Sequence, residues 1–394
     1  MHRFYLRDGL YLSLFVGLLF LPCKPALGVC EQHGSLKVVR LLEQVDQELS
    51  ANQPLAAQQR LELFKLKYAD EQHYLIDYHL GNLYSRSGQL EKALSAYDAA
   101  LSGCDQEPGI WQNRGKIAWD LKRYPVAADS LSRAYELDLN KEPSLLFHTA
   151  IARIYADQKD VALNLLEYLI GDVPEAVQDI WLETYTNLCL ELKQTDRALK
   201  HLTHWHRHFE TRKVFWRLLA ILHVQLRQYE EGAANLKVLA AFEPLNKTDK
   251  KLLADLLLQV NIPLEAAELY EELLTENPTE QQLHEQTIIC YRLGLQPQKA
   301  LDAIERALVV YRSVDLLQTQ GEIFFDQGQY KQAFQVFEQL LQLDSDKGIA
   351  YLYQGYCALR MEDLALARKV LTRASSYKSE RKEAKRLLEW MNKG

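Results

Sequence analysis

A small residue recurs about every 34 positions through most of this 394-residue chain. Successive members lie 33 to 36 residues apart, each inside a stretch with the composition of a helix. They are Ala93, Ala127, Ala162, Ala198, Gly232, Ala266, Ala300, Ala333 and Ala367. A unit of this length makes one pair of helices, which cannot bury both of its apolar faces alone. The period therefore predicts a stacked array of helical pairs.

Two further positions keep step with the recurring residue. Twelve residues earlier most units carry a small residue, such as Gly81 or Gly321, and four residues later each carries a bulky one, such as Tyr97 or Phe337. A small residue lets two helix backbones approach closely, and the bulky one fills the space between them. Gly328 stands where the turn between the two helices is expected.

The composition and the ends of the chain fit an all-α fold. Only 17 Gly and 11 Pro occur, so there is little material for long loops. Residues 36–50 and 54–68 predict a divergent helical pair ahead of the repeats. Its expected apolar residues are Leu36, Val39, Leu42 and Val45 on the first helix, and Leu61, Phe64 and Tyr68 on the second. Residues 378–390 predict a final charged helix that covers the last unit through Ala384, Leu387, Leu388 and Trp390.

These units resemble tetratricopeptide repeats. The matching residues include Trp111, Gly115, Ala127 and Ala134 in one unit, and Leu80, Gly81, Tyr84, Gly88, Ala93, Tyr97 and Ala100 in the unit before it. The resemblance implies a right-handed α-solenoid superhelix of about nine repeats over residues 71–377, with an N-terminal segment over 29–70 and a capping helix over 378–394. Units around Ala198 and Ala300 depart from the pattern, with Thr186 and Ile288 at the small first-helix position.

In such arrays the first helix of each repeat lines a concave groove. The outward positions of these helices carry a mixed polar set that suits an extended peptide or a protein surface. The expected groove residues are Tyr78, Asn82, Gln112, Lys116, Glu183, Asn187, Arg217, Lys251, Asp255, Glu285, Gln318, Glu322 and Tyr356. For any one of them, the alternative is an ordinary solvated helix face.

The first 28 residues have the pattern of a signal peptide. Arg3 and Arg7 precede an uncharged apolar run over residues 9–21, which is too short to cross a bilayer as a helix. Small residues at Ala26 and Gly28 predict cleavage before residue 29 and a periplasmic protein. An uncleaved anchor and a lipid on Cys30 are the alternatives.

Five cysteines follow the predicted signal peptide. Cys189, Cys290 and Cys357 fall within helical patterns and are expected to be buried apolar residues. Cys30 and Cys104 lie near the start of the array in non-helical or terminal contexts. Because an exported protein meets an oxidising compartment, we hypothesise that these two form a disulfide.

Charge and motifs exclude several classes of function. The chain carries 46 basic and 53 acidic residues, a net charge of −7, so nucleic acid and anionic membranes are not expected partners. No phosphate-binding loop, GxSxG or HExxH motif occurs, so no catalytic residue and no cofactor is expected. On a continuous helix His201, His204 and His208 would share one side and could bind a metal, but no carboxylate or Cys completes a site. We predict no metal site.

The second half of the array also resembles periplasmic tetratricopeptide proteins associated with TonB-type energy-transducing systems of Gram-negative bacteria. The resemblance rests on Trp216, Leu219, Ala220, Pro263, Ala266, Ala267, Gly355, Ala367, Arg368, Ala384 and Trp390. It implies a non-catalytic interaction scaffold that assists an outer-membrane uptake system and binds other proteins of the cell envelope. The alternative is an assembly factor for polysaccharide or outer-membrane proteins.

Overall fold

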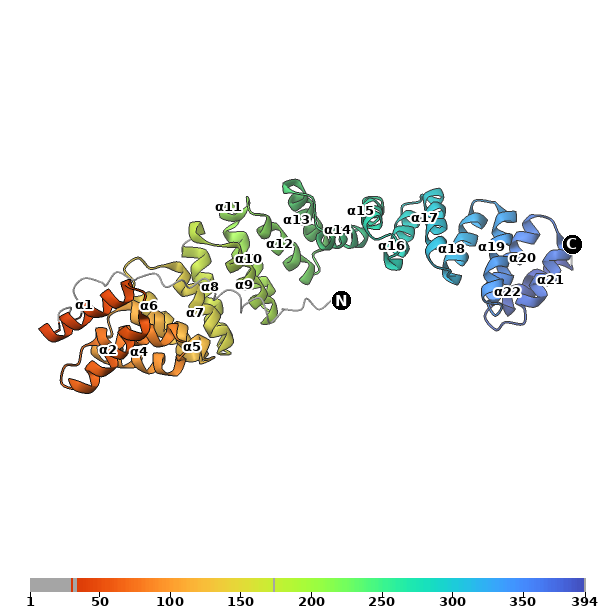
Figure 1. Cartoon of the computed structure of the whole chain (residues 1–394). Coiled ribbons are helices and arrows are strands. Elements are labelled where there is room, and N and C mark those ends of the chain that lie inside the picture. The colour runs from red at the N-terminus through yellow and green to blue at the C-terminus, as the bar shows by residue number, and fades with distance from the viewer. Residues whose placement is uncertain (1–29, 31–33, 173, 393–394) are drawn as a thin grey trace. The chain divides into compact units, whose positions relative to one another are not determined.

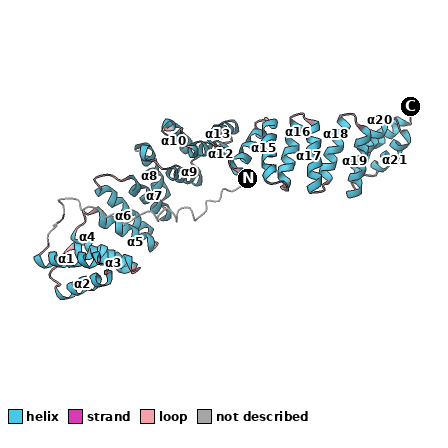
Figure 2. Cartoon of the chain, turned by 45° about the horizontal axis from the view of Figure 1, so that its top comes forward, coloured by secondary structure: helices cyan, strands magenta, loops and turns pink. Residues whose placement is uncertain are grey.

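The structure, a computed structural model, describes residue 30, residues 34–172 and residues 174–392. The predicted signal peptide at residues 1–28 lies outside these residues. Every regular element in the described part is helical (Figure 2), which confirms the all-α prediction. The chain divides into two compact units, Met1–Leu222 and His223–Gly394, and the division falls within one helix, α12 (Lys213–Gln225).

In the first unit the helices follow one another in chain order as a stack of pairs (Figure 1). An N-terminal pair, α1 (Leu36–Ser50) and α2 (Pro54–Lys67), precedes the repeats. The repeats then comprise α3 (Tyr74–Arg86), α4 (Leu90–Gly103), α5 (Pro108–Asp120), α6 (Tyr124–Leu137), α7 (Pro143–Tyr155), α8 (Lys159–Asp172), α9 (Asp179–Glu191) and α10 (Thr195–His204). A 3₁₀ turn over Pro174–Ala176 precedes α9, and the short α11 (His206–Phe209) follows α10.

The second unit continues the same alternation of first and second helices. It contains α13 (Tyr229–Phe242), α14 (Lys247–Gln259), α15 (Pro263–Glu276), α16 (Gln281–Leu293), α17 (Pro297–Val310), α18 (Val314–Asp326), α19 (Tyr330–Leu343), α20 (Gly348–Arg360), α21 (Leu364–Ala374) and α22 (Arg381–Met391). Helices α3 to α21, apart from the extra α11, therefore supply the first and second helices of the nine predicted repeats. The fold is an α-solenoid of tetratricopeptide type.

The packing rule read from the sequence is confirmed. All eight recurring alanines of the second helices are completely buried. A Cβ atom added to Gly321 would lie 2.6 Å from Cζ of Phe337, and one added to Gly81 would lie 2.6 Å from Cε1 of Tyr97. The small residue of the first helix is thus the surface on which the bulky residue of the second helix packs. Gly328 has φ 75°, the left-handed conformation that ends a helix at a tight turn.

The apolar face predicted for α1 is partly wrong. Val38, Leu41 and Val45 are buried, whereas Leu36 is 76% exposed. The buried residues form one core cluster with residues of α2 and α3, including Leu61 and Ile76. The face of α1 is therefore set by the position of its neighbours, which the periodicity of a short helix with several apolar residues leaves open.

Helix α22 covers the last repeat as predicted. Ala384 is completely buried, and Leu387 and Leu388 pack against the cluster formed by α20 and α21. Trp390, which was expected to join them, is 64% exposed. Met391, the next residue, packs against the same cluster, so Trp390 lies on the exposed side of the last turn.

Candidate functional site

The thirteen predicted groove residues share one structural setting. All are half-buried, and all lie on the first helices of their repeats. Each stands 15 or 11 residues before the recurring small residue, so two on the same helix are four residues apart and lie on one face. On α18, for example, the Gln318 amide donates a hydrogen bond to Oε1 of Glu322 at 2.9 Å.

The polar row is interrupted at α7. The two corresponding positions there are Phe147 and Ile151, which are 3% and 0% exposed. Single apolar residues also occupy one of the two positions on α12, α16 and α20, as Ile221, Ile289 and Leu352. The candidate surface therefore comprises separate polar segments, with apolar residues between them.

On α3 and α5, Asn82 is the centre of a hydrogen-bond cluster. Its Oδ1 accepts from the Tyr97 hydroxyl at 2.7 Å and from the Asn113 amide at 3.0 Å. The Asn113 amide also lies 3.4 Å from the Tyr78 hydroxyl. Tyr97 is completely buried, and this burial raises the pKa of its hydroxyl. Asn82 thus satisfies a buried donor as well as facing the candidate groove.

The same arrangement recurs on α14. The hydroxyl of Tyr270 donates to Oδ1 of Asp255, and Nζ of Lys251 lies 3.7 Å from the same carboxylate. Burial, followed by the contact with Asp255, raises the pKa of Tyr270. The two tyrosines occupy the same repeat position, and their acceptors stand 15 residues earlier in both repeats. These tyrosine–acceptor pairs were not predicted, although their 15-residue spacing is visible in the sequence.

Near the C-terminal end, aromatic side chains join the row. The rings of Phe325 and Tyr353 are 5.7 Å apart, and Tyr356 lies 6.1 Å from both. The Tyr356 hydroxyl donates to Oε1 of Glu383 on α22 at 2.8 Å, and burial, followed by this bond, raises its pKa to about 12. Arg292 reaches within 3.8 Å of Glu322. Phe325 and Tyr353 were not predicted as site residues.

One carboxylate in the first unit, Glu183, has a raised pKa. Burial raises the pKa of Glu183, and Asp179 one turn earlier adds to the effect, whereas Arg217 opposes it. A half-buried carboxylate of this kind is a better acceptor for a donor that arrives with a partner than one already in an ion pair.

The cysteines divide as the sequence analysis described. Cys30 and Cys104 form a disulfide in the structure, with 5.8 Å between their Cα atoms. Cys189, Cys290 and Cys357 are completely buried, and burial raises the thiol pKa of Cys189 and Cys357 to about 12 and that of Cys290 to about 11. These three thiols are poor nucleophiles at neutral pH.

The histidine run does not form the single helix on which its side chains could have shared a metal. Helix α10 ends at His204, and a separate short helix begins at His206. The Trp205 ring lies between the rings of His204 and His208, at 5.1 and 5.5 Å. His204 and His208 are therefore not successive turns of one helix. In the described part of the chain, no group of three His, Cys, Asp or Glu side chains is placed to hold a metal ion.

None of the helices within residues 34–172 and 174–392 is both long and apolar enough to cross a bilayer.

Comparison with known proteins agrees with the repeats. Two family models, both described as tetratricopeptide repeat, match the chain, one at residues 78–140 and 217–280 and the other at residues 324–391. The curated proteins gave no significant match.

Several solved structures are similar to the chain at low identity. They include the structure of Naa15/Naa10 bound to HypK-THB, with 14% identity and a TM-score of 0.46, over 89% of this chain and 66% of that one. A MamA protein has 14% identity and a TM-score of 0.37, over 43% of this chain and 94% of that one. A repeat protein from Parabacteroides merdae has 15% identity and a TM-score of 0.32, over 81% of this chain and 98% of that one.

Proposed function

We propose that this chain, which carries tetratricopeptide repeats, is a non-catalytic scaffold that holds an extended segment of a partner protein against its first helices. Such repeats generally mediate contacts between proteins. The observation that carries the proposal is the set of half-buried polar side chains at one or both of two fixed repeat positions, which occurs on every first helix from α3 to α20 except α7.

The chemistry of this row suits a peptide backbone better than a small molecule. An extended segment presents alternating N–H and C=O groups, and the row offers carboxylates, amides and cations in turn. Lys251 and Asp255 on α14 stand beside each other, as do Gln318 and Glu322 on α18. Apolar positions such as Ile289, which is 40% exposed, could take up side chains of the same segment.

We further propose that the scaffold works in the periplasm as an accessory of a TonB-type uptake system. Three observations support this proposal: the signal-like pattern of residues 1–28, the pairing of Cys30 with Cys104, and the resemblance of the second half of the chain to proteins of such systems.

The test is site-specific cross-linking in intact cells. A photoreactive amino acid at Gln318, on the candidate groove, is expected to capture components of a TonB-type complex. The same residue at Glu338, exposed on the second helix α19 of the same repeat, is the matched control and is expected to capture much less.

Two results would contradict the proposal in different ways. Equal capture at the two positions would show that the first helices are not the binding surface. Capture at Gln318 of polysaccharide-synthesis or outer-membrane assembly proteins alone would keep the scaffold and replace the uptake system by the alternative role.

A further inference from the structure

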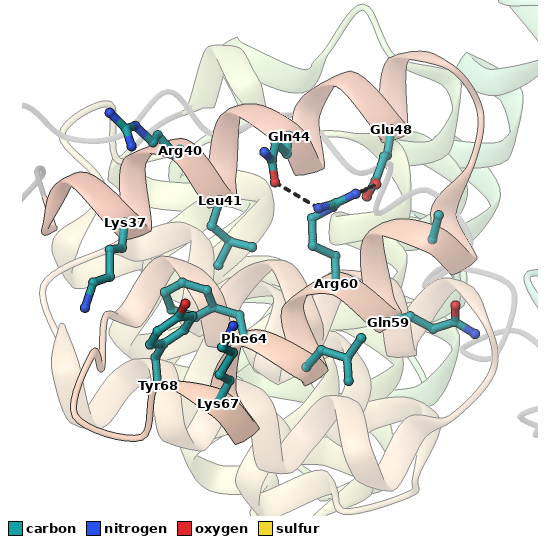
Figure 3. Close-up of a pocket in the computed structure, with 12 residues that line it drawn as sticks. Lys37, Arg40, Leu41, Gln44, Glu48, Gln59, Arg60, Phe64, Lys67 and Tyr68 are labelled. Atoms are coloured by element: carbon teal, nitrogen blue, oxygen red, sulfur yellow. Dashed lines mark hydrogen bonds and ion pairs between the residues drawn. The ribbon is translucent and has the colours of Figure 1, made fainter.

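A second candidate surface lies outside the repeats, on the N-terminal helical pair. A groove of about 540 Å³ runs between α1 and α2 (Figure 3). Leu41, Leu63 and Phe64 supply its apolar lining, and the Tyr68 ring lies at the end near Lys37 and Lys67. None of the thirteen groove residues predicted from the sequence takes part in it.

The lining of this groove has the opposite charge to the whole protein. Four cations, Lys37, Arg40, Arg60 and Lys67, face it with a single carboxylate, Glu48. The chain as a whole has a net charge of −7. A local excess of cations on an acidic protein favours an anionic partner at this place and disfavours one elsewhere.

Two of the four cations are not neutralised by a described carboxylate. Arg60 donates to Glu48 at 2.8 Å and to Gln44 at 2.9 Å, and Lys37 donates to Glu71 at 2.9 Å. Arg40 has no hydrogen bond or ion pair within the described residues. The contact of Lys67 is with a ring: its Nζ lies 5.2 Å from the centre of Tyr68.

Apolar exposure is also concentrated on this pair. Leu36, Leu55, Leu63 and Leu66 are 76%, 65%, 64% and 83% exposed. Leu63 lines the groove, and the other three leucines lie elsewhere on the same two helices. A merely protective end would be polar throughout, whereas this pair combines exposed leucines with Arg40 and Lys67, which have no ion pair with a described residue.

We propose that the groove between α1 and α2 binds an acidic amphipathic segment of a partner protein. Apolar side chains of that segment pack on Leu41, Leu63 and Phe64, and its carboxylates pair with Arg40 and Lys67. This surface is separate from the first-helix row, so the protein has two contact sites, and the failure of either leaves the other intact.

Charge argues against two segments of this chain and against a nucleic acid as the occupant. Residues 1–28 carry Arg3, Arg7 and Lys24 against one acidic residue, Asp8, so they have the same sign as the groove. Helix α22 of a second copy is also basic, with four cations and two carboxylates over Arg381–Met391. A nucleic acid would meet apolar side chains in the lining and an acidic protein around them.

The proposal can be tested by fluorescence anisotropy with the full chain and two synthetic probes. One labelled helical peptide carries Leu at the i, i+3, i+4 and i+7 positions of one face and Glu on its flanks. The second has Lys in place of every Glu. The acidic peptide is expected to bind, and more weakly as salt is added, whereas the basic peptide is not.

Variants locate the binding. Arg40→Glu with Lys67→Glu is expected to weaken the acidic peptide about tenfold or more, because it reverses two charges at the rim. Leu63→Ser, at a side chain already largely exposed, is expected to weaken it by a smaller factor without loss of the folded state. Lys200→Glu with Arg207→Glu makes the same change in net charge at exposed positions of the same unit and is expected to leave the affinity within about twofold.

Several outcomes would overturn the proposal. One is equal weakening by the groove pair and the control pair, and another is equal binding of the two peptides. Tighter binding of anionic phospholipid vesicles or of an oligonucleotide than of the acidic peptide, with the same dependence on Arg40 and Lys67, would assign the groove to that partner. Circular dichroism of each variant separates lost binding from lost folding.

Discussion

Two repeats, α18 with α19 and α9 with α10, have the same fold but pack their two helices together through different residues. In the first, Gly321 admits the Phe337 ring, which stacks on Tyr353 of the next repeat at 5.0 Å. In the second, the small position is held by Thr186, a buried residue whose hydroxyl has no hydrogen-bond partner in the described part of the chain. The second helix is also shorter, with 10 residues in α10 against 14 in α19.

Polar contacts replace ring packing in the less regular repeat. Glu167 on α8 accepts from the Tyr185 hydroxyl at 2.8 Å and from two nitrogens of Arg197 at 2.7 and 2.6 Å. Burial alone would raise the pKa of Glu167, but the bonds from Arg197 and Tyr185 outweigh it and hold the pKa below its usual range. A repeat that lacks the glycine and the ring therefore combines buried apolar side chains such as Leu202 with hydrogen bonds between helices.

The largest expected effect is on the regular repeat. Gly321→Val should lower the free energy of unfolding of the C-terminal repeats by about 3 kcal/mol, because its Cβ would overlap a ring that has no free space. Urea unfolding followed by circular dichroism measures the change. Gln335→Val, exposed on α19, is the control for placing a β-branched residue in a helix. An equal effect of the two substitutions would show that the Phe337 ring does not require a glycine.

A smaller effect is expected from the polar network. Glu167→Ala should cost about 2 kcal/mol, because it leaves the Arg197 guanidinium without its carboxylate partner and removes the Glu167 acceptor of the buried Tyr185 hydroxyl. Glu191→Ala removes an exposed ion pair with Lys159 and should cost less than about 1 kcal/mol. The same unfolding measurement compares them. If the two variants were equally stable, the Glu167 network would contribute no more to the stability of this repeat than an exposed ion pair does.

The smallest expected effect is a gain in stability. Thr186→Val keeps the shape of the side chain and removes a buried hydroxyl without a partner, so it should raise the free energy of unfolding by about 1 kcal/mol. Thr184→Val, a residue of the same helix whose hydroxyl donates to the Ile180 carbonyl at 2.7 Å, is the matched control and should show no gain. A loss of stability for Thr186→Val would mean that its hydroxyl has a partner, such as a bound water.

Much of the fold could be predicted because the same residue pattern recurs in nine units. Any single glycine and phenylalanine would be weak evidence, but the same register over nine units leaves one arrangement in which all of the small residues are buried. The resemblance to tetratricopeptide repeats implied that the first helices carry the candidate groove, and the register then selected positions four apart, which share a face. Its hydrogen bonds did not, because Asn82 and Asp255 find their tyrosine partners only when the second helix is in place.

Two features, the helix break in the histidine run and the groove of the N-terminal pair, were not predicted from the sequence. The composition of residues 201–208 allows a helix, yet helix α10 ends before Trp205. Phe209 is buried, and the centre of its ring lies 6.2 Å from that of Phe215. Both helices of the N-terminal pair were predicted, but not the groove between them. A groove depends on how far apart two helices lie, and no periodicity within one helix records that distance.

The 34-residue period was enough to predict the helical pairs, their order and the residues that join them, because it places small side chains opposite large ones in each pair. Which polar residues meet depends on the folded arrangement of the helices. The Glu167 network and the cationic groove both depend on side chains from separate helices, and their spacing follows from the packing of the whole stack.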